Sequence, residues 1–278
     1  MSEELKELPV PQYLSAEEKR WSRKLYEENF IEDTEKFTDF YYTYKIRDNE
    51  ILGLKEDGQL VAMLHLNPYY LIVNGYEVRS SYIVAVATRE RYRHRGYMRI
   101  LLEKALRDSA ARKMPFVFLM PASESIYAPF DFVWLCPYTA VPGRVERMEA
   151  EEQNHYLAAR YQMFCRRDQR YLENLRAERE AEKGEIPPDH MPPYMLRITD
   201  VSQALRLVGS RENSRRYLHI TDPVIAENNG YFLWETMEGE TRAERLDERP
   251  GRLDLELSVG ELVSLLFSNL GICLSEVV

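Results

Sequence analysis

The sequence predicts an α+β fold, in which a mixed and mostly antiparallel sheet with helices is followed by a smaller α+β domain. Short apolar runs between residues 50 and 88 are separated by Asp57-Gly58 and Asn74-Gly75, which favour tight hairpin turns. The last of these runs leads into a helical pattern from Gly96 to about Lys113, and the apolar run 115–120 follows it. A helix between two strands of one sheet indicates a parallel pair with a right-handed crossover.

Two domains are expected from the length of 278 residues and from a cluster of chain breakers after residue 183. Gly184 and the pairs Pro187-Pro188 and Pro192-Pro193 interrupt every local pattern there. We therefore expect a first domain over residues 1–145, a charged helical connector over 146–190 and a second domain over 191–278.

Two helical segments are expected before the meander, over residues 15–30 and from Asp33 to residue 46. The second segment places Phe37, Phe40, Tyr41 and Tyr44 on one face. A ligand site is possible there, but an aromatic stripe at helical spacing is more often part of a core.

The charge balance argues against general nucleic-acid binding, because the net charge is -9. No apolar run reaches the ~20 residues of a membrane span, and the opening residues have no signal-peptide pattern, so a cytoplasmic location is expected. The three cysteines and five histidines show no spacing typical of a disulfide framework or a metal site.

The stretch Ser81–Met98, SYIVAVATRERYRHRGYM, predicts a phosphate-binding turn between a strand and a helix. An apolar run ends at Thr88, a basic segment follows, and Gly96 precedes a run of helix formers. This order directs free backbone N–H groups at an anion, and arginines add charge and forked hydrogen bonds to phosphate oxygens. A solvated turn or a subunit contact is the competing interpretation of the arginines.

The segment VATRERYRHRGYMRILLEKAL resembles the acetyl-CoA binding motif of the GNAT acyltransferase superfamily, with Arg93, Gly96 and Met98 at the motif positions. Methionine departs from the glycine or alanine of the last position, although its backbone N–H can still serve. The resemblance implies that the backbone of Arg91–Met98 binds the pyrophosphate of acetyl-CoA and that Val86, Ala87 and Thr88 pair with the pantetheine arm. The residues concerned in the turn are Arg91, Arg93, His94, Arg95, Gly96, Tyr97 and Met98.

A wider resemblance points to one branch of this superfamily. The segments LMPASESIYAPFDF, TDPVIAENNGYFLWE and LDLELSVGELVSLLF are similar to the enhanced intracellular survival (Eis-like) acetyltransferases, which end in a sterol-carrier-like domain. Members of that branch usually carry a second acetyltransferase-like domain in between. Residues 146–190 are therefore interpreted as a remnant of that domain or as its replacement.

The resemblance also supplies candidates for the catalytic groups. It implies that Tyr127 protonates the leaving thiolate and that Ser123 and Glu124 approach the cofactor, whereas a tyrosine that only caps the core is the plainer interpretation. In the related branch the terminal carboxylate enters the active site, so Val278 is the candidate base. Glu276, a relayed water or no specific base are the alternatives.

We therefore expect an acetyl-CoA-dependent N-acetyltransferase of the GNAT fold that transfers the acetyl group directly to a primary amine. The acidic chain favours a cationic acceptor, either a small molecule or a lysine side chain. The alternative is a catalytically weak CoA-binding protein, or one whose terminal domain binds an apolar ligand or builds an oligomer. Acetyl-CoA, an amine acceptor and a second copy of the chain are the expected partners, with no metal, nucleic acid or membrane.

Overall fold

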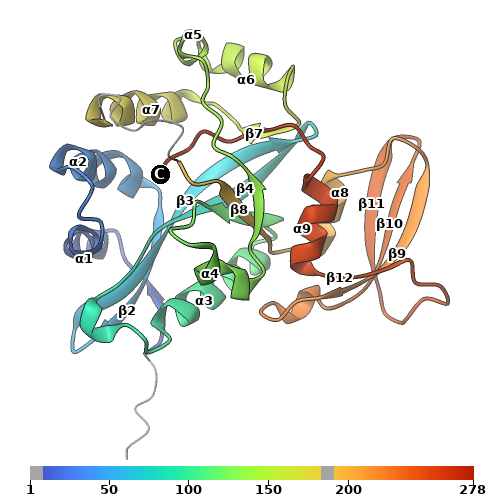
Figure 1. Cartoon of the computed structure of the whole chain (residues 1–278), viewed down its shortest axis with the longest axis horizontal. Helices are drawn as coiled ribbons and strands as arrows, with labels where there is room; N and C mark the ends of the chain where they lie inside the picture. The colour runs from blue at the N-terminus through green and yellow to red at the C-terminus, as the bar shows by residue number, and fades with distance from the viewer. Residues whose placement is uncertain (1–8, 183–190) are drawn as a thin grey trace, which may run out of the picture. The chain divides into compact units, whose positions relative to one another are not determined.

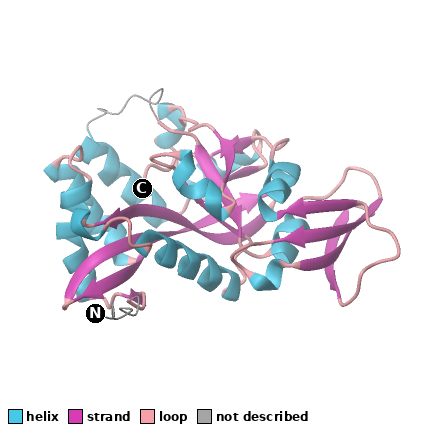
Figure 2. Ribbon diagram, turned by 60° about the horizontal axis from the view of Figure 1, so that its bottom comes forward, coloured by secondary structure: helices cyan, strands magenta, loops and turns pink. Residues whose placement is uncertain are grey.

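The computed structural model describes residues 9–182 and 191–278. The chain breakers Gly184, Pro187 and Pro188 lie outside the described residues. The α+β class is confirmed: a nine-stranded mixed sheet is accompanied by a separate four-stranded sheet (Figures 1 and 2). The chain divides into a first unit, formed by residues up to Asn67 and Ile83–Ala105, and a second unit, formed by Pro68–Tyr82 and Leu106–Val278.

The first unit begins with the short strand β1 and two helices. Thr34 caps the second helix by accepting a hydrogen bond from the Phe37 N–H at 3.2 Å, so this helix begins one residue later than Asp33 suggests. The Asp33 carboxylate instead accepts a hydrogen bond from the Tyr26 hydroxyl at 2.6 Å. The elements are β1 (Gln12–Tyr13), α1 (Ser22–Asn29) and α2 (Glu35–Tyr44).

The predicted meander is formed by β2 (Glu50–Glu56), β3 (Gln59–Val73) and β4 (Tyr76–Thr88). Asp57 and Gly58 both have positive φ, of 49° and 74°, as the two central residues of a type I′ turn require. Asn74 and Gly75 repeat this at the next turn, with φ of 48° and 86°. The long strands β3 and β4 contribute residues to both units.

The helix after the meander is α3 (Tyr97–Ala111), and β5 (Phe116–Leu119) returns parallel to β4. Tyr82 and Phe118 are partners in this parallel pairing, and their rings stack at 4.9 Å. The remaining elements before the breaker segment are α4 (Glu124–Tyr127), β6 (Val133–Cys136), α5 (Gly143–Glu146), α6 (Ala150–Ala158), β7 (Met163–Cys165) and α7 (Gln169–Glu182).

The segment expected to be a helical connector contributes a strand to the large sheet. The three-residue strand β7 interrupts the helices and pairs antiparallel with β3, at Leu71↔Cys165. Near the end of the chain, β13 (Ile272–Cys273) pairs parallel with β7. Strands of two or three residues are too short to show an alternation of apolar and polar residues, and their pairing depends on partners far away in the chain.

The sequence places the domain boundary at residue 191, whereas the following strand belongs to the large sheet. This strand, β8 (Tyr194–Ile198), is fully buried and pairs antiparallel with both β5 and β6. The nine-stranded sheet has the order β1-β2-β3-β4-β5-β8-β6, with β7 and β13 off this path.

The smaller sheet has the strand order β11-β10-β9-β12 and carries two helices along one side (Figures 1 and 2). Asp200 caps the first helix, and Ser258 with Glu261 forms a capping box on the second. The elements are α8 (Val201–Leu207), β9 (Ser214–Thr221), β10 (Gly230–Met237), β11 (Glu240–Leu246), β12 (Leu255–Ser258) and α9 (Val259–Phe267).

Candidate functional site

The end of β4 is held firmly in the first unit. The Arg89 N–H, one residue beyond the strand, donates to the Val61 carbonyl on β3 at 2.9 Å. Val86 and Thr88 are half-buried, and Ala87 between them is buried. Successive side chains of a strand point to opposite faces of the sheet, so Val86 and Thr88 share one face and Ala87 points to the other.

An irregularity in β4 was not foreseen from the sequence. Ala85 has a φ of 50°, a left-handed conformation that costs an L-residue roughly 1–2 kcal/mol. Such a residue inside a strand bends it locally, and irregularities of this kind recur beside binding sites. Alanine gives no local signal for this conformation, unlike glycine or asparagine.

The basic segment forms a tight turn before α3. A short 3₁₀ helix, Glu90–Tyr92, is followed by two residues with positive φ, His94 at 63° and Gly96 at 81°. No heavy atom of the surroundings lies within 4 Å of a Cβ built on Gly96, so glycine is required here by its φ and not by crowding. The turn ends at Tyr97, where the first N–H groups of α3 have no partner within the helix. Backbone N–H groups in such an arrangement are available to an anion.

The arginine side chains fasten the turn to the first unit. Arg93 donates to the Asn29 side chain at 3.0 Å and to the Thr88 carbonyl at 3.2 Å. Arg91 and Arg95 both lie over the Tyr92 ring, with guanidinium carbons 4.8 and 4.9 Å from its centroid. In the structure these groups hold the backbone of the turn in place, whereas the sequence predicts forked contacts to phosphate for them.

Most residues of the turn are exposed, whereas Tyr97 at its end is buried. Arg91, Arg93, His94, Arg95 and Gly96 are exposed, and Met98 is half-buried. Tyr97 is buried and stacks on Tyr92 with ring centroids 6.4 Å apart, so its ring belongs to the core while its N–H lies at the helix start.

Tyr127 is the last residue of the short helix α4 in the second unit. Its ring packs edge-on against Phe132 at 5.7 Å, and 6% of the residue is exposed. Burial raises the pKa of the Tyr127 hydroxyl to about 12. The hydroxyl is therefore protonated at neutral pH and can act as a proton donor.

Ser123 and Glu124 stand at the beginning of the same helix. Both residues are exposed, and the Ser123 hydroxyl lies 2.9 Å from the Ser125 hydroxyl. The exposed position leaves their side chains accessible from solvent, which is compatible with the predicted approach to a cofactor.

The last residues of the chain are clamped by three buried tyrosines. The hydroxyl of Tyr69 donates to the Val278 oxygen at 2.7 Å, that of Tyr82 to the Val277 carbonyl at 3.1 Å, and that of Tyr194 to the Glu276 carbonyl at 2.7 Å. Val278 is 9% exposed. The tail is thus ordered at three consecutive residues by side chains from β3, β4 and β8.

A buried ion pair fixes the tail from another side. The Arg167 guanidinium donates to the Glu276 carboxylate at 2.7 Å, and each side chain is 1% exposed. The Tyr171 hydroxyl adds a hydrogen bond to the same oxygen at 2.6 Å. Burial disfavours the Glu276 carboxylate, but the Arg167 charge and the hydrogen bonds from Tyr171 and Arg167 outweigh it and hold its pKa below the usual range.

His65 on β3 has one satisfied ring nitrogen. Its Nδ1 lies 2.9 Å from the Tyr41 hydroxyl, which also donates to Asn67 at 3.2 Å. Among the described residues, the buried Nε2 of His65 and Nδ2 of Asn67 have no hydrogen-bond partner. Burial, followed by the charge of Lys19, lowers the pKa of His65 to about 3, so the ring is neutral.

The candidate residues thus form two local groups. The first unit brings together Val86, Ala87 and Thr88 with the turn residues up to Met98, and the second unit contains Ser123, Glu124, Tyr127 and Val278. Sequence reasoning missed the tyrosine clamp and Arg167. The partners of the tail are more than 80 residues away along the chain, so no local pattern in the sequence indicates these contacts.

Residues 12–135 match the model of the acetyltransferase (GNAT) domain, and residues 201–272 match that of the sterol carrier protein domain. No curated protein matches the sequence at a significant level. Among solved structures, a probable N-acyltransferase from Enterococcus faecalis is similar over 90% of this chain and 87% of its own, with 14% identity and a TM-score of 0.67.

Two further solved structures share the fold. A GCN5-related N-acetyltransferase from Anabaena variabilis is 14% identical, with a TM-score of 0.66 over 92% of this chain and 89% of its own. Eis1 from Mycobacterium abscessus is 13% identical, with a TM-score of 0.65 over 93% of this chain and 89% of its own.

The matches define the class of each region: residues 12–135 form a GNAT-type acetyltransferase domain, and residues 201–272 form a sterol carrier protein domain. The expected likeness to Eis-type proteins is confirmed at the level of the fold. Within residues 9–182 and 191–278, no helix is long and apolar enough to cross a bilayer. Cys136, Cys165 and Cys273 are free thiols.

Proposed function

We propose that this protein transfers an acetyl group from acetyl-CoA directly to a primary amine of a cationic small molecule or of a lysine side chain. The observation that carries the proposal is the turn before α3, where left-handed Gly96 leads into the helix start within the matched acetyltransferase domain. Backbone N–H groups of Arg91–Met98 bind the pyrophosphate, and the edge of Val86–Thr88 pairs with the pantetheine arm.

The proposed transfer needs two proton movements. The amine nitrogen attacks the thioester carbonyl, the C–N bond forms and the C–S bond breaks. Tyr127 gives its proton to the leaving thiolate, since a tyrosine hydroxyl is protonated at neutral pH whether or not it is buried. The ammonium proton passes to the Val278 carboxylate, which Tyr69 orients through its 2.7 Å hydrogen bond.

Glu276 is a weaker candidate for the base. Its carboxylate already accepts hydrogen bonds from Arg167 and Tyr171, and a lowered pKa makes it less basic. Its role in the proposal is to anchor the tail on which Val278 stands.

The acidic net charge of the chain favours a cationic amine as the acceptor. With a net charge of -9, the chain attracts cations over distances up to the Debye length, about 8 Å at physiological ionic strength. Polyamine-like, aminoglycoside-like and lysine-containing acceptors fit this requirement.

The sterol carrier match keeps a second function in view, the binding of an apolar ligand by the terminal domain. One cavity that this domain helps to line is not of that kind, since charged side chains such as Arg206, Glu227 and Arg245 surround it. The acetyltransferase function is therefore the better supported of the two.

The test is the release of CoA thiol from acetyl-CoA with a panel of polyamines, aminoglycosides and a lysine peptide. Turnover with at least one amine, lost in Gly96→Val while the fold remains intact, is expected. Tight binding of acetyl-CoA without turnover on any amine would instead support a CoA-binding role. The base is tested by deletion of Val278 alone, because deletion of the last three residues also leaves Arg167 without Glu276.

A further inference from the structure

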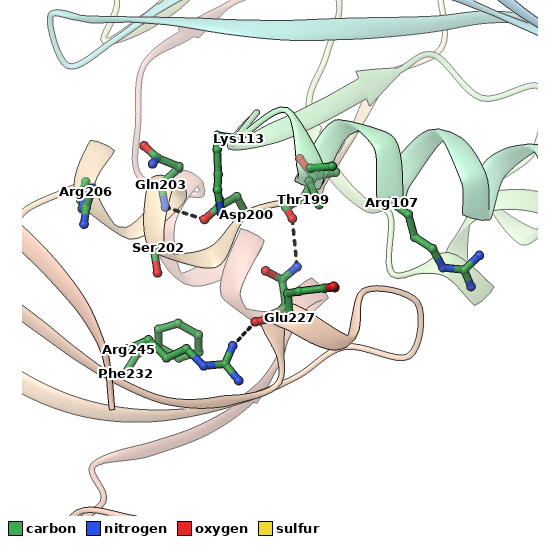
Figure 3. Close-up of a pocket in the computed structure, with 13 residues that line it drawn as sticks. Arg107, Lys113, Thr199, Asp200, Ser202, Gln203, Arg206, Glu227, Phe232 and Arg245 are labelled. Atoms are coloured by element: carbon green, nitrogen blue, oxygen red, sulfur yellow. Dashed lines mark hydrogen bonds and ion pairs between the residues drawn. The ribbon is translucent and has the colours of Figure 1, made fainter. Parts of the chain in front are cut away.

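A cavity of about 510 Å³ lies in the second unit, and no residue assigned to acetyl transfer lines it. Its walls come from the end of α3, from α8 and from β10 and β11 with the turn before them (Figure 3). Binding sites for small organic molecules usually enclose about 300–1,000 Å³, so this volume suits a metabolite. The ionisable side chains in the lining are Arg107, Lys113, Arg206, Arg245, Asp200 and Glu227.

The lining is cationic although the chain is acidic. Four basic side chains stand against two acidic ones in the lining, whereas the whole chain has a net charge of -9. One acid is already balanced, because the Asp200 carboxylate pairs with the Lys113 ammonium at 3.4 Å and accepts the Gln203 N–H at 3.0 Å. The lining then still holds the guanidinium groups of Arg206 and Arg245 beside the single carboxylate of Glu227.

Neutral backbone groups hold these guanidinium groups in place. Arg206 donates to the Ala243 carbonyl at 3.2 Å, and Arg107 donates to the Val224 carbonyl at 3.3 Å. Arg245 donates to the Asn229 carbonyl at 2.7 Å and to the Glu227 carbonyl, as Figure 3 shows for the second contact. A carbonyl fixes a guanidinium without cancelling its charge, and each guanidinium has five N–H donors.

The floor of the cavity is built from satisfied and buried groups. Phe232 is 1% exposed, and the Arg245 guanidinium carbon lies 5.9 Å from its ring centroid. Asn228 is 4% exposed and uses its side chain to accept the Val201 N–H and to donate to the Thr199 carbonyl. The cavity is thus preformed, with its polar floor engaged and its charges at the walls.

The geometry points to a binding site for a small organic anion that carries at least two phosphate or carboxylate groups. The guanidinium groups come from three separate elements, α3, α8 and β11, so a ligand with two anionic ends meets more than one of them. The site shares no residue with the acetyl-CoA turn and does not depend on the proposed transfer. Glu227 limits the affinity of the site for anions, since its carboxylate repels them.

Isothermal titration calorimetry at low ionic strength with two probes, inorganic pyrophosphate and citrate, tests this site and separates phosphate from carboxylate recognition. We expect saturable binding of at least one probe, weakened about tenfold or more in Arg245→Met. Glu227→Gln removes the repelling charge from an exposed side chain and is expected to strengthen binding severalfold. Arg252→Gln is the matched control, because Arg252 is 82% exposed, pairs with Asp254 and lies outside the lining, and it leaves binding unchanged.

Three results would overturn the site. The first is that neither probe binds saturably, and the second is that Glu227→Gln does not strengthen binding. The third is that binding is lost in Gly96→Val and retained in Arg245→Met, because the probe then binds at the turn before α3. If Arg245→Met does not fold, as a thermal melt would show, Glu227→Gln decides the outcome alone.

Discussion

The Arg167 guanidinium and the Glu276 carboxylate form an ion pair of 2.7 Å in which both side chains are almost completely buried. The pair joins the loop between β7 and α7 to the last residues of the chain. A buried pair of this kind adds little net stability over an apolar pair, but loss of one partner leaves an uncompensated charge. It therefore fixes the position of the tail more than it adds to the stability of the fold.

Arg167→Gln is expected to lower the free energy of unfolding by about 3–5 kcal/mol, because Glu276 then remains buried without its cation. Urea unfolding followed by circular dichroism measures this. The double variant Arg167→Gln/Glu276→Gln removes both charges and recovers part of the loss. A single-variant loss below about 1 kcal/mol would show that the pair is solvated, as surface pairs are.

The same pair predicts a pH dependence. The pKa of Glu276 is lowered on folding, so its contribution to stability is present above the unfolded pKa of about 4.3 and is lost as the pH falls through the folded value. The stability difference between the wild type and Glu276→Gln is expected to shrink as the pH falls from about 6 to about 3. A difference that stays constant over this range would mean that Glu276 does not titrate with folding.

Tyr127→Phe is expected to lower kcat by about 10²- to 10⁴-fold, with little change in the affinity for acetyl-CoA. Because burial raises the pKa of the hydroxyl to about 12, the wild type keeps its donor well above the usual tyrosine pKa. The expected profile of kcat therefore shows no loss near pH 10 from this group. An unchanged kcat in the variant would remove Tyr127 from the mechanism.

Tyr69→Phe tests whether the tail must be oriented for transfer. Tyr69 and Tyr82 are buried neighbours with ring centroids 6.2 Å apart, and each donates to the tail, but only Tyr69 contacts the Val278 oxygen. We expect Tyr69→Phe to lower kcat more than Tyr82→Phe, while KM for acetyl-CoA changes little in either. Equal effects of the two substitutions would show that the clamp serves only the stability of the tail.

Gly96→Ala separates backbone conformation from crowding. With a φ of 81° and open space around it, Gly96 loses about 1–2 kcal/mol of local stability on gaining a Cβ, and acetyl-CoA affinity is expected to fall with it. Gly58→Ala is the control, because its φ is 74° and its surroundings are equally open. Calorimetry with acetyl-CoA should show weaker binding only for Gly96→Ala. An equal loss of affinity in Gly96→Ala and Gly58→Ala would show that the turn before α3 is not responsible for the change.

Local signals in the sequence were sufficient for the meander, both hairpin turns, α3 and the turn before it. Asn74-Gly75 and Asp57-Gly58 specify their turns because few residues tolerate positive φ. The strands β7 and β8 were not predicted as members of the large sheet, since their pairing partners on β3 and β5 are remote in the chain. Arg167, Tyr69 and the left-handed Ala85 were missed for the same reason, because tertiary contacts and not composition determine them.

The central claim, direct acetyl transfer to an amine, is tested most directly by incubating the protein with acetyl-CoA labelled in the acetyl group and a polyamine, then following the label by mass spectrometry. We predict that the label appears on the amine in step with the release of CoA thiol, and that neither occurs in Gly96→Val. Label that stays on CoA with every amine, or that accumulates on the protein itself, would contradict the claim.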